Sequence, residues 1–203
     1  MNEKMEDLEL KSRLNLIEAM IAEGRQTTES WGWTFVLWGI AYYVAIAWSA
    51  LGQSNLAWPV TMIGTSILTA VIASLKGRRE PETTIGRAIS AIWIGVGVSL
   101  FTFCLCASIA RRIDVQTFIA VVTAMLGAAN AISSIILKWK AQFACALIWW
   151  TASALSCFGT VKQSSILGLV AIFLGQIVFG SYMMISEARE RRANQRKSGA
   201  AHA

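Results

Sequence analysis

Long uncharged stretches dominate the pattern of hydrophobic and polar positions along this chain. No Asp, Glu, Lys or Arg occurs between Glu29 and Lys76, and four more uncharged stretches follow. A helix needs ~20 apolar residues to cross a ~30 Å hydrocarbon core, so the first stretch is long enough for two. The pattern predicts an all-α, polytopic membrane protein with six transmembrane helices, at about 31–51, 57–75, 88–110, 116–137, 141–160 and 165–185.

Composition supports the membrane interpretation over a soluble helical bundle. The chain is 55% hydrophobic and only 15% charged, whereas soluble domains carry roughly 25% charged residues. A surface helix of a soluble protein needs a polar face at 3.6-residue spacing. The stretch 88–110 offers only scattered hydroxyls and no charged face, so we reject the soluble interpretation.

The charges divide the chain into a leader at 1–30, a transmembrane part at 31–186 and a basic tail at 187–203. Of the 18 basic residues, all but Arg111, Arg112 and Lys162 fall on one predicted side of the membrane. Because basic loops stay in the cytoplasm, we expect a cell (inner or plasma) membrane protein with both termini cytoplasmic. Trp139 is expected to be an anchor at that interface, and the tail is expected to continue the sixth helix toward anionic headgroups.

The leader predicts a helix over 3–23 with one apolar stripe, made of Leu10, Leu14, Ile17 and Ile21 at heptad-like spacing. Gly24 is expected to end this helix. The polar positions of the leader are predominantly acidic, whereas a helix that lies on anionic lipid is rich in Lys and Arg. The stripe is therefore predicted to pack on protein, either on a second copy, on the chain's own loops or on a cytoplasmic partner.

The spans contain none of the ionisable groups that intramembrane chemistry uses. They carry no carboxylate, Lys, Arg or His, and the only histidine is His202 in the tail. The four cysteines lie within spans and form no Cys-x-x-Cys pair, so each is expected to behave as a small hydrophobe. We therefore expect no catalytic, cofactor-binding or metal site and no enzymatic activity. The short basic tail lacks stacking aromatics, and no nucleic-acid partner is expected.

Two polar residues stand out within the predicted spans, Asn130 in the fourth and Gln176 in the sixth. One interpretation is a hydrogen bond between helices. The other is that Asn130, Gln176, Thr65 and Ser66 line a polar cavity for an uncharged solute or a monovalent cation. These interpretations correspond to two functions. The first is an interaction, regulatory or structural membrane protein whose leader docks a partner, and the alternative is a small transporter or channel.

A short pattern recurs in the spans. Each even-numbered span has a hydrophobic pair followed by Gly64, Gly127 or Gly175, and each odd-numbered span has an early Trp. The pattern predicts one helical hairpin used three times, as internal repeats of membrane folds permit. In this layout, residues 31–186 resemble the acid-resistance HdeD-type group of small six-span proteins. The resemblance implies a hairpin-built fold and transfers no functional residue.

Overall fold

The computed structural model describes residues 2–52, 56–77, 84–110 and 113–201. Within these ranges the chain is helical almost throughout and contains no strand. Three loop segments lie outside these ranges, at 53–55, 78–83 and 111–112. They include Arg78, Arg79, Arg111 and Arg112. The elements are α1 (Asn2–Glu29), α2 (Gly32–Gly52), α3 (Ala57–Gly77), α4 (Thr84–Ala110), α5 (Val115–Ile136), α6 (Lys140–Phe158), α7 (Val161–Ile172), the π-helix η1 (Phe173–Val178) and α8 (Phe179–Ala201).

Six helices are long and apolar enough to cross a membrane, which confirms the predicted all-helical, multi-span fold. Their bounds lie within a few residues of the predicted spans, except in the last helix. There α7, η1 and α8 follow one another without a break from Val161 to Ala201. The basic tail therefore continues the sixth span as a helix, as predicted.

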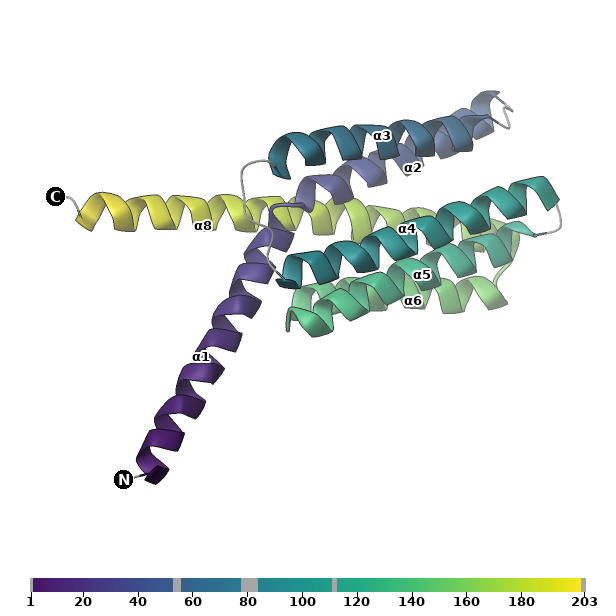
Figure 1. The fold of residues 1–203 in the computed structure, drawn as a ribbon. Helices are drawn as coiled ribbons and strands as arrows, with labels where there is room; N and C mark the ends of the chain where they lie inside the picture. The colour runs from purple at the N-terminus through teal and green to yellow at the C-terminus, as the bar shows by residue number, and fades with distance from the viewer. Residues whose placement is uncertain (1, 53–55, 78–83, 111–112, 202–203) are drawn as a thin grey trace.

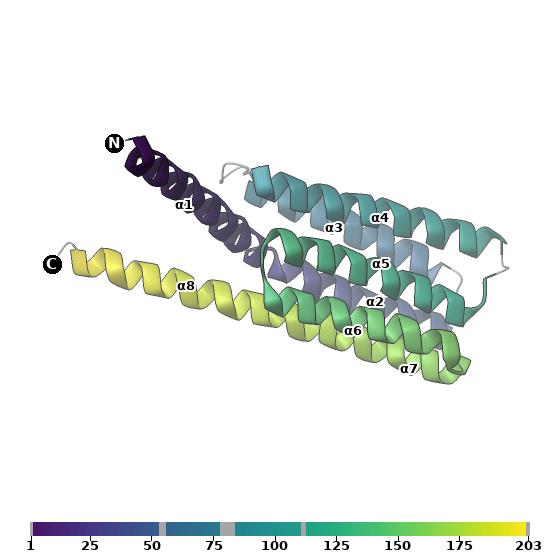
Figure 2. The same cartoon turned by 90° about the horizontal axis from the view of Figure 1, so that it is seen from below.

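The six spans run side by side, and both termini project from the same end of the bundle (Figures 1 and 2). α6 packs along α5, and it also contacts α7 and η1. α2 lies against η1 and α8, α3 packs mainly against α2, and α4 lies along α5. The most apolar stretch of α3 or α4 is only 6% buried within the chain, against 50% for α5. The tight core therefore lies around α5, α6 and η1, while α3 and α4 form its outer layer.

Two adjacent tryptophans of α6 each pack on a glycine of a neighbouring helix. A Cβ added to Gly175 of η1 would lie 2.4 Å from Trp149 Nε1, and a Cβ on Gly127 of α5 would come equally close to the Trp150 ring. Such contacts let helices approach closely where burial of apolar surface gives no driving force between them. At Gly64 of α3, however, no described atom lies within 4 Å of the corresponding position. The three predicted hairpins therefore do not share an equivalent Trp–Gly contact.

α5 and α6 are joined by a short connection, Leu137–Trp139. Lys138 adopts a left-handed conformation (φ 49°), and the Trp139 amide donates to the Ser134 carbonyl at 2.9 Å. The Trp139 side chain is only 3% exposed, and its ring centroid lies 5.7 Å from that of Phe179. The prediction of an interfacial anchor is therefore wrong for Trp139, which packs against α8.

The predicted helix stop at Gly24 is also wrong, because α1 continues to Glu29. Gly24 is buried, and a Cβ there would lie 2.5 Å from Ile85 Cγ2 and 3.4 Å from Leu137 Cδ2. The glycine thus serves close packing of α1 on α4 and on the α5–α6 connection. A glycine followed by polar residues looks the same in a sequence whether it ends a helix or allows a neighbouring helix to pack closely against it.

Replacing Gly175 by Ala should destabilise the fold, because the added methyl group would overlap the Trp149 indole. We expect Gly175→Ala to lower the free energy of unfolding by about 1–3 kcal/mol, the usual cost of overpacking. Gly95→Ala is the matched control, because its methyl group would meet no described atom within 4 Å. Thermal unfolding of the purified protein in detergent measures both variants. Equal stability of the two would contradict the Trp149–Gly175 contact.

Candidate functional site

The leader helix carries its apolar stripe away from the bundle. α1 leaves the bundle at an angle, and only its C-terminal part lies against other helices (Figures 1 and 2). Of the predicted stripe, Leu10, Leu14 and Ile17 are each more than half exposed, and Ile21 is half-buried. The structure therefore leaves most of the stripe without a partner within the described part of the chain.

The base of α1 is held at the bundle by an arginine that makes two contacts. The Arg25 guanidinium carbon lies 5.0 Å from the centroid of a Trp139 ring, and Arg25 Nε donates to Glu29 Oε1 at 3.2 Å. A cation above an indole face is attracted by the ring quadrupole. The contact with Trp139 links α1 to the α5–α6 connection, where the Leu137 side chain also reaches Gly24, while the bond to Glu29 lies within α1.

Glu29 is a buried carboxylate, only 1% exposed, at the junction of α1 with α8. Burial raises the pKa of its carboxyl above the ordinary 4.5, and the negative charge of Glu190 raises it further, while Arg25 opposes both effects. Oε2 of Glu29 has no hydrogen-bond partner among the described residues. The junction therefore favours the protonated form of this acid more strongly than solvent would.

The ion pairs of the described residues stay within single helices. Arg13 pairs with Glu9 at 2.6 Å in α1, and Arg191 pairs with Glu187 at 2.7 Å in α8. Leader and tail also point away from each other beyond the junction (Figure 2). Neither of these two ion pairs joins the leader to the tail.

The four residues predicted to line a polar cavity are distributed over three parts of the bundle. Thr65 and Ser66 lie on α3, where each hydroxyl donates to a carbonyl of its own helix, Thr61 O at 2.7 Å and Met62 O at 2.8 Å. Thr65 is buried and Ser66 is exposed. The α3 hydroxyls are therefore satisfied locally and lie in the outer layer.

Asn130 and Gln176 are both buried, but they do not hydrogen-bond to each other in the described structure. Asn130 Nδ2 donates to the Leu126 carbonyl of α5 at 2.9 Å, and its Oδ1 has no partner. Gln176 belongs to η1 and lies against α2, where its Cβ would be 2.9 Å from a Cβ added to Gly39. The predicted interhelical bond between these two residues is thus absent from the described contacts.

Sequence reasoning missed the most isolated polar side chain of the core, Gln142 of α6. It has no exposed surface, and neither of its amide atoms has a hydrogen-bond partner among the described residues. Ser133 of α5 is equally buried, and its hydroxyl likewise has no partner. One available signal was spacing, because Gln142, Cys145 and Trp149 share one face of α6, and apolar residues on a helix face usually mark the core.

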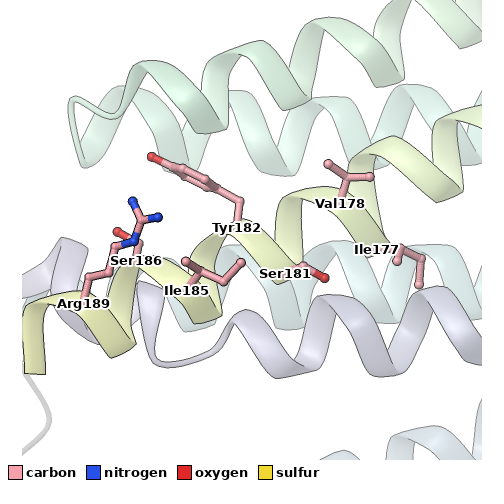
Figure 3. A pocket seen from close by; sticks show the side chains of 7 residues that line it. All are labelled: Ile177, Val178, Ser181, Tyr182, Ile185, Ser186 and Arg189. Atoms are coloured by element: carbon pink, nitrogen blue, oxygen red, sulfur yellow. The ribbon is translucent and has the colours of Figure 1, made fainter. Parts of the chain in front are cut away.

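A groove of about 530 Å³ runs along the first turns of α8 (Figure 3). Its inner end is apolar, at Ile177 and Val178, and its outer end carries the Ser186 hydroxyl and the Arg189 guanidinium. This order of groups matches an interface between hydrocarbon and headgroups. The lining consists of Ile177, Val178, Ser181, Tyr182, Ile185, Ser186 and Arg189.

Among the described residues, no group of three or more His, Cys, Asp or Glu side chains is placed to hold a metal ion. Comparison with protein-family models, with curated proteins and with solved structures finds no match to this chain. The functional argument therefore rests on the exposed leader stripe, the Arg25–Glu29 junction and the polar core.

Glu29 should make stability depend on pH. Because its pKa is raised in the folded protein, its contribution favours folding below 4.5 and is lost as the pH rises through the folded pKa. Glu29→Gln mimics the protonated form, so we expect a flatter profile of stability above pH 4.5. Thermal unfolding across a pH series measures the effect. Glu9→Gln is the matched control, since exposed Glu9 also pairs with an arginine four residues away. If both variants keep the wild-type profile, the Glu29 assignment is wrong.

Proposed function

We propose that this chain is a non-enzymatic, multi-pass membrane protein of interaction, regulatory or structural type. In this proposal the leader stripe of Leu10, Leu14, Ile17 and Ile21 docks a second copy or a cytoplasmic protein. The observation that carries it is the exposure of this stripe on a helix that leaves the bundle. The absence of Asp, Glu, Lys, Arg and His from the central parts of the spans supports the non-enzymatic part.

Charge favours a protein over lipid as the occupant of the stripe. Acidic residues of α1, including Glu9, Glu18 and Glu23, would be repelled by an anionic membrane surface. An apolar stripe at heptad-like spacing is suited to another helix, whose side chains would fill the spaces between stripe residues. Arg25 and Gly24 fix the base of α1, so a docked helix would be held close to the end of the bundle.

Substitution of the stripe should abolish docking without affecting the bundle. We expect Leu14→Gln combined with Ile17→Gln to reduce cross-links from residues 3–23 by about fivefold or more, since both side chains lie at the centre of the proposed contact. The measurement is cross-linking with mass spectrometry on the tagged protein in its native membrane. Leu16→Gln is the matched control, because Leu16 is exposed on a different face of α1. Wild-type protein without any cross-link from 3–23 would contradict the proposal.

We further propose a cell (inner or plasma) membrane location with both termini in the cytoplasm. The distribution of basic residues supports it, because the leader, the second loop, the α5–α6 connection and the tail carry most of them. Both termini also lie at the same end of the bundle (Figure 2).

Reporter fusions test this orientation. A reporter that is active only in the cytoplasm should work when fused at 78–83 and after Ala203, and should fail when fused at 111–112. A reporter that is active only outside should give the reverse pattern. A translocated loop at 78–83 would overturn the orientation.

The alternative function, a small transporter or channel for an uncharged or small solute, keeps one supporting observation. Oδ1 of Asn130, the hydroxyl of Ser133 and both amide atoms of Gln142 lack hydrogen-bond partners within the described structure. Thr65 and Ser66, in contrast, do not contribute to that cluster. Solute flux in proteoliposomes, retained after deletion of residues 1–24, would favour transport over docking.

A further inference from the structure

Unpartnered polar atoms gather in one part of the bundle, on α5, on α6 and on the connection between them. They are Oδ1 of Asn130, Oγ of Ser133, both amide atoms of Gln142 and Nε1 of Trp139. The side chains of Asn130, Ser133 and Gln142 have no exposed surface. Buried polar atoms in proteins nearly always have a partner, and those that do not require an explanation.

Contacts on both sides of α6 place Gln142 among these groups. Trp150 packs on Gly127, and Ser153 Oγ donates to Ala120 O at 2.8 Å, which fixes how α6 runs antiparallel to α5. The pairs Trp150–Gly127 and Ser153–Ala120 define the register of the two helices. Extended toward the start of α6, this register places Gln142 at the same height as the turn of α5 around Ser133. On the other side, Cys145 Sγ lies 3.5 Å from Gly175 O, which puts Gln142 level with the end of η1.

The neighbouring helix segment is a π-helix, Phe173–Val178. Such segments are rare and frequently occur at functional sites, because they disturb the regular pairing of backbone groups. Gly175 and Trp149 meet at this segment. α6 therefore brings Gln142 close to a part of the sixth span with irregular backbone hydrogen bonding.

The base of α1 covers this region at the end of the bundle. The Leu137 side chain lies against Gly24, and the Trp139 ring lies beneath the Arg25 guanidinium. Leu137 and Trp139 are themselves buried. Both belong to the connection at the end of the bundle, about one turn beyond Ser133 of α5 and Gln142 of α6.

We propose that Asn130, Ser133 and Gln142 form a binding site for a small neutral molecule that both donates and accepts hydrogen bonds, and that α1 covers its entrance. The site offers an acceptor on Asn130, a donor and an acceptor on Gln142, and a hydroxyl that serves as either. None of its groups carries a charge, and a charged ligand would be buried without a counter-ion. Water is the smallest molecule with these properties.

Cysteine labelling in the membrane tests both parts of the proposal. Cys104, Cys106, Cys145 and Cys157 are replaced by Ala, and Ser133→Cys is then treated with neutral methyl methanethiosulfonate. Ile132→Cys and Ile135→Cys are the matched controls, because these neighbours face outward from the bundle. Only the thiolate reacts, and apolar surroundings suppress its formation, so we expect Ser133→Cys to react about tenfold faster than both controls.

A second pair of variants tests the cover. Arg25→Ala removes the contact on Trp139 and should raise the labelling rate of Ser133→Cys several-fold. Arg13→Ala is its control, because Arg13 also pairs with a glutamate of α1 but is exposed and far from the connection. If the site binds small solutes, glycerol should slow the labelling of Ser133→Cys, and sucrose at the same osmolarity should not. If glycerol and sucrose change the labelling rate equally, the occupant is water.

Each outcome decides one part of the proposal. Labelling of Ser133→Cys as slow as that of the Ile controls in every background, with the same result for Gln142→Cys, would show a dry core and overturn the site. Rapid labelling that Arg25→Ala does not change would support the site and overturn the cover. The result is independent of leader docking, because Leu14→Gln with Ile17→Gln leaves Gly24 and Arg25 in place.

Discussion

The contact of two adjacent indoles with two glycines determines how the centre of this protein is assembled. Trp149 and Trp150 point from α6 toward η1 and α5, and each ring occupies space that a side chain on Gly175 or Gly127 would fill. Trp149 is fully buried, and a Trp buries a large apolar area, whereas Trp150 packs one side of its ring on Gly127 and stays partly exposed. Because lipid already solvates apolar side chains, this fit between shapes, rather than exclusion of water, holds α5, α6 and η1 together.

The remaining helices depend on this centre to different degrees. α2 reaches it through close approach at Gly32, Gly39 and Gly180, where Cβ atoms would meet the neighbouring helix at less than 3 Å. α3 and α4 bury little of their apolar surface within the chain. α1 touches only the end of the bundle, so its position depends on a few contacts at Gly24 and Arg25. A helix held by so few contacts can move without disturbing the core.

The spans were predictable from sequence because the length of an uncharged run follows from the thickness of the hydrocarbon core, which is roughly 30 Å in typical bilayers. The roles of single residues were less accessible. Gly24 has charged neighbours and Gly175 largely apolar ones, and only the position of a neighbouring helix shows that both make a close contact. The sequence does not distinguish Gln142 from other polar residues of the spans, because its lack of hydrogen-bond partners depends on which residues of α5 and η1 lie opposite it. Helix pairing is a tertiary property, which hydrophobic periodicity does not contain.

A buried Gln142 without hydrogen-bond partners would destabilise a core that had only a structural role. Leaving a buried polar atom without a hydrogen bond costs about 1–3 kcal/mol, and in hydrocarbon no solvent is available to relieve it. A methionine of similar length would fill the same space without this cost. Local violations of packing rules tend to occur at functional sites. Gln142 lies one turn below the same connection that Gly24 and Arg25 contact, so a movement of the base of α1 would act directly on the cover of the polar core.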